Sequence, residues 1–176
     1  DLGEEERLKA INKGIAGDFT VPVKVTDLTF EGLDNLSDSV SLTCKVEVKK
    51  VMQDVAGMKV LTLPWSDKIS SLDELTLEKR NTPLELWSYN TDELNRERLE
   101  FILPQGVSFV EMPKNIHLEC ANASFDLAFD KSSDGKLIGT RVFRRKTELV
   151  TPEQYPAFRE FMTHVSEADN KQYAIK

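Results

Sequence analysis

Apolar residues recur at every second position through much of this chain, and that period predicts β-strands. The clearest strand is expected at residues 39–50, with one face buried and the other exposed to solvent. Its apolar face is formed by Val40, Leu42, Cys44, Val46 and Val48. Residues 84–89 and 94–103 are expected to form a hairpin. Together with shorter runs, the pattern predicts about eight strands and a mainly β fold, an antiparallel β-sandwich.

Two long strands are expected around the turn Lys131-Ser132-Ser133-Asp134-Gly135, because Asp-Gly tolerates the positive φ angles of a tight hairpin. In the first strand, residues 115–130, the alternation changes phase once. A phase change turns side chains to the other face unless a residue bulges out, so a β-bulge or a bend is expected near residues 120–122. The return strand, residues 136–150, has apolar side chains in both phases and is expected to be partly covered on both faces.

An amphipathic helix is predicted after these strands. Thr151 and Gln154 have the spacing of a capping box, and Pro152 suits a first helical position. Pro156 implies either an irregular first turn or a helix that begins at that residue. One face carries Tyr155, Phe158, Phe161, Met162 and Val165. We expect this stripe to pack in the core; a lipid or cofactor groove is the alternative interpretation.

The first residues, 1–17, predict a short charged helix with a thin apolar stripe formed by Leu8, Ile11 and Ile15. So narrow a stripe anchors a helix poorly, and we interpret this segment as a helical lead-in or a linker from an upstream domain. The β-sandwich domain with its C-terminal helix is then expected at residues 18–176. Because the chain starts with Asp1 and no signal peptide opens it, we interpret it as a mature product or an excised portion of a longer one.

The chain has 176 residues and a net charge of -7, which disfavours non-specific binding to nucleic acid or an anionic membrane. No apolar run approaches the roughly 20 residues of a membrane span. One basic cluster stands out, formed by Arg141, Arg144, Arg145 and Lys146. On a strand these side chains divide between the two faces, so a solvated sheet edge is favoured over a phosphate site.

Catalysis by cysteine requires a thiolate beside a histidine, and the candidates are Cys44, Cys120, His117 and His164. Cys44 lies in the predicted buried phase of its strand, where a thiol is inert. His117 and Cys120 are three residues apart on a strand, so they point to opposite faces. We therefore expect no enzyme, and no metal or cofactor either, since no ligand spacing or phosphate-binding glycine pattern is present. A disulfide between the two cysteines and two free thiols both stay open.

Two weaker sites remain. Trp65, Trp87 and Tyr89 would form an aromatic platform for a sugar ring or a peptide if they were exposed, although such residues more often fill a core. Asp38-Ser39-Val40 resembles an O-glycosylation acceptor that some Gram-negative bacteria use on exported proteins, which makes Ser39 a candidate modification site.

Several phrases together resemble the uncharacterised domain at the C-terminus of bacterial transglutaminase-like proteins. They are Arg80-Asn81-Thr82-Pro83-Leu84, Phe101-Ile102-Leu103-Pro104-Gln105-Gly106, Met112-Pro113, Tyr155-Pro156-Ala157-Phe158-Arg159-Glu160-Phe161 and Ala168-Asp169. The resemblance implies an exported, periplasmic or cell-surface protein and a β-sandwich tail that follows a transglutaminase-like core. The nucleophilic cysteine of that family belongs to the upstream core, so no catalytic residue is carried over.

We therefore expect a non-catalytic accessory domain that acts as a scaffold or interaction module beside an upstream transglutaminase-like domain of the same polypeptide. The alternative is a β-sandwich module that binds a cell-wall glycan or a peptide.

Overall fold

The computed structural model describes residues 4–17, 23–32, 41–48, 52–69, 71–86, 92–103, 105–132, 136–146 and 148–176. The chain folds into two compact units, Asp1–Gln53 and Asp54–Lys176. The predicted boundary between residues 17 and 18 lies at the edge of an undescribed segment and stays a prediction. The described strands pair antiparallel, and two α-helices accompany them, so the prediction of a mainly β fold with a helix near each end is confirmed.

The first unit contains α1 (Glu4–Gly17) and the paired strands β1 (Val23–Glu31) and β2 (Ser41–Val48), with α1 in contact with β1. The strand expected at residues 39–50 is therefore present. The prediction that its apolar face is buried is wrong for Leu42, which is 43% exposed, and Cys44 is only half-buried. In the described part of this unit the strands form a two-stranded ribbon, which has little against which to bury a face.

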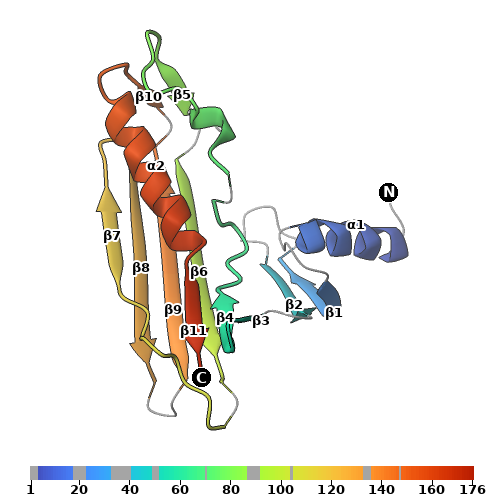
Figure 1. Cartoon of the computed structure of the whole chain (residues 1–176). Coiled ribbons are helices and arrows are strands. Elements are labelled where there is room, and N and C mark those ends of the chain that lie inside the picture. Colours follow the sequence, from blue (N-terminus) through green and yellow to red (C-terminus); the bar gives the residue numbers. More distant parts are fainter. Residues whose placement is uncertain are drawn as a thin grey trace. The chain divides into compact units, whose positions relative to one another are not determined.

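The second unit is built on a four-stranded sheet in the order β6-β9-β8-β7 (Figure 1). Its strands are β6 (Glu93–Phe101), β7 (Ile116–Glu119), β8 (Ala123–Lys131) and β9 (Leu137–Arg145). The predicted β8–β9 hairpin is confirmed, with pairs from Lys131↔Leu137 to Ala123↔Arg145. Of the bulge and the bend predicted near residues 120–122, the bend is found. The chain reverses there, Cys120 N donates to Ala123 O, and β7 pairs antiparallel with β8, so the phase change marks a turn.

Shorter strands complete the second unit. β5 (Leu84–Leu86) pairs with β10 (Glu148–Val150), and β6 pairs with β9, so the predicted hairpin between residues 84–89 and 94–103 is wrong. A further sheet has the order β11-β4-β3. Its strands are β3 (Met52–Val55), which spans the boundary between the two units, β4 (Met58–Thr62) and β11 (Gln172–Ile175). A 3₁₀ turn, η1 (Asp73–Leu75), follows β4.

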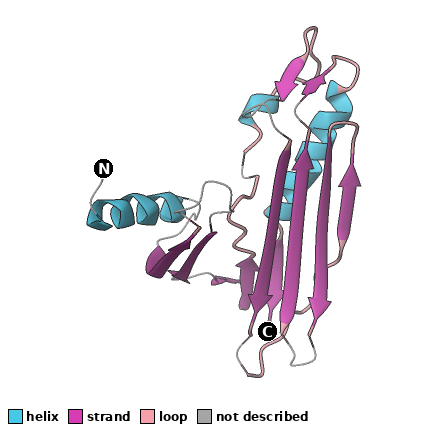
Figure 2. Ribbon diagram, turned by 180° about the vertical axis from the view of Figure 1, so that it is seen from behind, coloured by secondary structure: helices cyan, strands magenta, loops and turns pink. Residues whose placement is uncertain are grey.

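Helix α2 (Tyr155–Asp169) covers one face of the four-stranded sheet, and β11 follows it across the same face (Figures 1 and 2). The reciprocal hydrogen bonds of the predicted capping box are present, since Gln154 Oε1 accepts from Thr151 N at 3.0 Å and Thr151 Oγ1 accepts from Gln154 N at 3.3 Å. They close a turn that precedes the helix, whose N-cap is Gln154, so the predicted cap at Thr151 is wrong. The helix begins one residue before Pro156. The predicted stripe is buried, which confirms core packing; its members are Tyr155, Phe158, Phe161, Met162 and Val165. Phe158 and Met162 also line a pocket of about 470 Å³ beside η1 and β5.

The core lies between the sheet and the elements that cross it. Phe143 of β9 meets Phe161 of α2 with ring centroids 6.4 Å apart, and Phe129 of β8 meets Tyr173 of β11 at 6.2 Å. The two layers therefore have a sandwich-like arrangement, with α2 and β11 on the inner face of the sheet. Gly139 permits a close approach, because a Cβ at that position would lie 3.0 Å from Trp65 Cη2.

Candidate functional site

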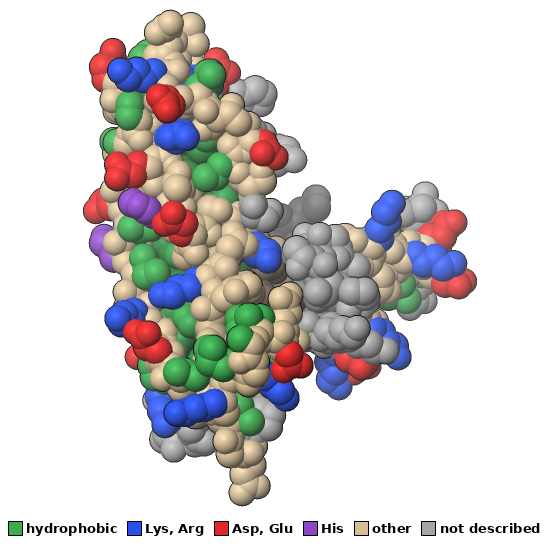
Figure 3. All heavy atoms as spheres, viewed as in Figure 1, with side chains coloured by type: hydrophobic (Ala, Val, Ile, Leu, Met, Phe, Trp, Pro, Cys, Tyr) green, Lys and Arg blue, Asp and Glu red, His purple; other side chains and the backbone are tan. Residues whose placement is uncertain are grey.

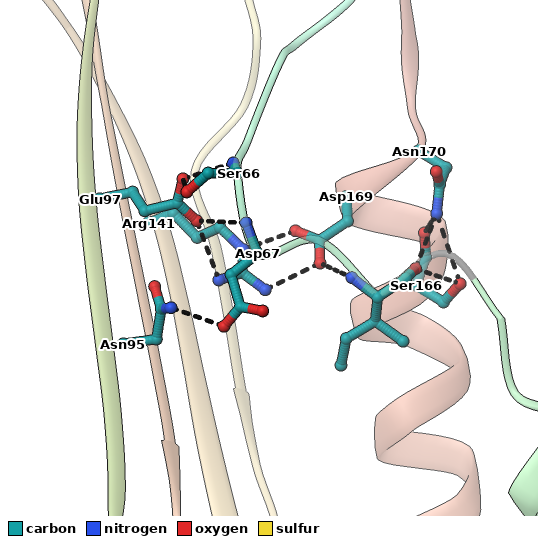
Figure 4. A network of polar contacts seen from close by, with 9 residues as sticks. Ser66, Asp67, Asn95, Glu97, Arg141, Ser166, Asp169 and Asn170 are labelled. Atoms are coloured by element: carbon teal, nitrogen blue, oxygen red, sulfur yellow. Dashed lines mark hydrogen bonds and ion pairs between the residues drawn. The ribbon is translucent and has the colours of Figure 1, made fainter. Parts of the chain in front are cut away.

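The deepest polar group in the second unit is an ion pair between the sheet and the end of α2. Arg141 Nε donates to Asp169 Oδ1 at 2.8 Å and Nη2 donates to Oδ2 at 2.9 Å, with the two side chains 1% and 0% exposed (Figure 4). Glu97 Oε1 accepts a longer bond from Nη1 at 3.4 Å. The guanidinium also lies over the rings of Phe125 and Phe143. We call Glu97, Arg141 and Asp169 the Arg141 cluster.

The two carboxylates of this cluster also hold the segment between β4 and η1. Glu97 Oε2 accepts from Ser66 N at 2.6 Å and from Ser66 Oγ at 2.8 Å. Asp169 Oδ2 accepts from Ile69 N at 2.9 Å, and Ser166 Oγ donates to Ile69 O at 2.9 Å. A buried charge is tolerated when an opposite charge and hydrogen bonds satisfy it. The cluster therefore joins the sheet, the segment and the helix, and its groups are engaged in that structural role.

The basic residues predicted at a sheet edge lie on β9 and just after it. β9 is an inner strand between β6 and β8, so the predicted edge is wrong, and Arg141 is buried because Asp169 faces it. Arg145 pairs with Glu93 at 2.7 Å, and Lys146 Nζ donates to Ala121 O at 2.9 Å. Arg144, Arg145 and Lys146 line one surface pocket, but the carboxylates of Asp92, Glu93 and Glu119 line it with them, which disfavours a phosphate site there.

The nucleophile candidates do not form a catalytic group in the described part of the chain. Both cysteines are free thiols, so of the two alternatives for Cys44 and Cys120 the unpaired state is found. His164 is exposed on α2, and His117 is exposed on β7 with Nδ1 2.6 Å from Asp126 Oδ1.

Within the described residues, no group of three or more His, Cys, Asp or Glu side chains is arranged to hold a metal ion. None of the helices there has the length and apolar character needed to cross a membrane.

His117 is expected to have a pKa above its ordinary value of 6.5, because it hydrogen-bonds to Asp126 and is attracted by that carboxylate. Its protonation therefore stabilises the fold fully below the ordinary pKa, and this contribution is lost as the pH rises through the folded-state pKa. A pH titration of the ring signals by NMR measures the pKa directly. Asp126→Asn should lower the pKa of His117 toward 6.5; an unchanged titration in that variant would contradict the assignment.

The aromatic residues predicted as a binding platform have different outcomes. Trp65 is 1% exposed and lies in the core, so it presents no ring face to a ligand. Trp87 and Tyr89 lie outside the described residues, and for them the platform stays a prediction. The modification site at Ser39 also lies outside them and stays a prediction.

A surface groove opens where β6 ends and β9 begins, with a volume of about 210 Å³. Seven of its ten lining residues are apolar, and the lining consists of Phe101, Ile102, Leu103, Val107, Ser108, Phe109, Met112, Lys131, Lys136 and Leu137. Ile102 is 75% exposed and Met112 49% exposed. Figure 3 shows hydrophobic side chains gathered in the lower part of this face, with basic side chains beside them. We call this feature the apolar groove.

The walls of the apolar groove are held by backbone hydrogen bonds. Phe101 and Leu137 are opposite each other on β6 and β9. The other wall follows β11, because Ser108 N donates to Lys176 O at 2.8 Å and Val110 N donates to Ala174 O at 2.9 Å. No motif in the sequence marked this site. The segment Val107–Met112 carries four apolar residues with Ser108 and Glu111 among them, and a segment of that kind equally indicates a half-buried strand.

One comparison with known proteins gives a match. Residues 57–175 match a family model described as a Domain of Unknown Function (DUF3858). No curated protein and no solved structure matches the chain.

Proposed function

The chain belongs to the DUF3858 family of domains of unknown function, and we propose that it is a non-catalytic accessory domain of an exported transglutaminase-like protein. In this proposal it is a scaffold or interaction module that lies beside the upstream transglutaminase-like domain of the same polypeptide. The transglutaminase association and the periplasmic or cell-surface location come from the resemblance of its sequence phrases, and the role as an interaction module comes from its surface.

The apolar groove is the observation that carries the proposal. Large contiguous patches of exposed apolar surface often mark a place where another molecule binds, and Ile102 and Met112 place exposed apolar side chains at this groove. Several of the exposed or half-buried lining residues also belong to the phrases that carry the resemblance, namely Phe101, Ile102, Leu103 and Met112. The groove therefore lies in the part of the chain that most resembles a domain next to a transglutaminase-like core.

The Arg141 cluster supports the scaffold part of the proposal. It ties β6, β9, the segment after β4 and the end of α2 to one another through charged hydrogen bonds, of which the bond between Arg141 and Asp169 is buried. Such bonds are shorter and stronger than neutral ones, and a network of them favours one arrangement of its elements. A firmly held sheet and helix can present a binding surface without rearranging it, which reduces the entropic cost of binding.

The proposal is tested by comparing the isolated chain with the longest product of the reading frame that encodes it. Both are assayed for amide hydrolysis and amide transfer, with and without alkylation of their thiols. We expect thiol-dependent turnover in the longer product and none in the isolated chain. Turnover by the isolated chain that alkylation abolishes would contradict the proposal, and so would a reading frame without a transglutaminase-like core.

A further inference from the structure

We propose that the apolar groove receives one apolar side chain, flanked by a carboxylate, from the neighbouring transglutaminase-like domain of the same polypeptide. This inference rests on the proposed function and adds the contact surface and the chemistry of the partner segment.

The size of the groove favours an anchoring side chain over a small-molecule ligand. A cavity of 150 Å³ holds one benzene ring, whereas pockets for drug-sized ligands and cofactors measure about 300–1,000 Å³. At about 210 Å³ the apolar groove has room for a single leucine, methionine or aromatic side chain. Interfaces between proteins commonly depend on a few such side chains, each seated in an apolar pocket.

The charges at the groove indicate which charged group accompanies the inserted apolar side chain on the partner segment. The charged residues in its lining are Lys131 and Lys136, and no acidic side chain is found among the described lining residues. This local excess of positive charge contrasts with the net charge of -7 for the chain. Lys136 is 3.9 Å from Glu100, whereas no carboxylate among the described residues lies within ion-pair distance of Lys131. A carboxylate on the partner would therefore complement Lys131.

The same charges disfavour a second copy of this chain as the occupant. In a symmetric dimer the same patch faces itself, so the lysines of one groove would lie near those of the other. Like charges brought together at an interface oppose association. Lys114 follows the groove segment and is paired with Glu111 at 3.0 Å. This ion pair adds no net charge, so the charge at the groove stays positive.

The walls of the groove are arranged to keep its shape. Phe101 and Leu137 are paired across β6 and β9, and the segment around Ser108 is hydrogen-bonded to β11. A pocket formed before binding requires little reorganisation, which favours insertion of a rigid anchor. A covalently linked domain also faces the groove at a high effective concentration, so a modest contact area is sufficient.

The test is zero-length cross-linking of the longer polypeptide with a water-soluble carbodiimide, followed by mass spectrometry. The reagent activates a carboxyl group, and an amine in direct contact then replaces the activating group to form an amide. We expect Lys131 to be joined to an Asp or Glu of the preceding domain. Ile102→Ser should lower the yield of this cross-link about tenfold, because it removes an exposed wall of the groove.

Leu149→Ser is the matched control, because Leu149 is an exposed apolar residue on β10 and does not line the groove. Its cross-link yield should equal that of the parent polypeptide. If other lysines of the chain are joined to the preceding domain but Lys131 is not, this inference is overturned and the proposed function stands. An equal loss in the Ile102 and Leu149 variants would also overturn it. A reading frame that encodes no transglutaminase-like domain would contradict both the docking inference and the proposed function.

Discussion

Asp169→Ala is expected to lower the free energy of unfolding by about 3–5 kcal/mol, because it leaves the buried guanidinium of Arg141 without its main partner. The substitution also removes the acceptor of the Ile69 amide, which would release the segment between β4 and η1. Since small domains are stable by only about 5–15 kcal/mol, we expect a large decrease in the denaturant midpoint. Chemical unfolding followed by circular dichroism measures it.

Two further variants separate the buried charge from a general effect of substitution. Arg98→Ala removes an exposed ion pair with Glu100 and should cost no more than about 1 kcal/mol. The double substitution Arg141→Met with Asp169→Leu removes both charges and should be less destabilising than Asp169→Ala alone. Equal losses for Asp169→Ala and Arg98→Ala would show that the Arg141 cluster does not stabilise the fold.

Trp65→Ala is expected to lower the free energy of unfolding by about 3–5 kcal/mol. The side chain is 1% exposed and packs against Gly139, so its removal leaves a cavity between the segment after β4 and the sheet. Thermal unfolding, monitored by circular dichroism, gives the change in stability.

Trp65→Phe is the conservative comparison. It should lower the free energy of unfolding by less than Trp65→Ala does, because the smaller ring retains part of the contact with β9. Leu149→Ala, at an exposed position, should change stability by no more than about 0.5 kcal/mol. A Trp65→Ala variant as stable as the parent would contradict the core assignment and would return Trp65 to the predicted aromatic platform.

The elements that the sequence predicted well are those whose signals are local. The Asp134-Gly135 turn predicted the β8–β9 hairpin, and the spacing of Thr151 and Gln154 predicted the turn that leads into α2. The apolar stripe of α2 also matched its buried residues, because a period of 3.6 assigns a face from sequence alone.

Strand neighbours were predicted poorly, because alternation reveals the faces of a strand and not its partners. Leu86 pairs with Glu148 and Phe101 with Leu137, where a local hairpin was expected. At Cys120 the alternation of apolar residues changes phase because the chain turns there. A bulge and a tight turn produce the same change of phase in a sequence, so the pattern alone does not distinguish them.

The buried charge and the apolar groove depend on contacts between distant segments. Arg141 was one of four basic residues in a short run, and its partner Asp169 lies 28 positions away, so nothing local distinguished it. The groove is assembled from the end of β6, the segment that pairs with β11 and the ends of β8 and β9. Each of these pieces resembles an ordinary strand or loop until folding brings them together.

The most direct test of the accessory-domain proposal is hydrogen–deuterium exchange of residues 105–112, compared between the isolated chain and the longer polypeptide. These residues form one wall of the apolar groove, so a docked neighbouring domain would shield their amides. The account predicts slower exchange of this segment in the longer polypeptide, with no change at β10. Equal exchange rates of residues 105–112 in the two proteins would contradict it.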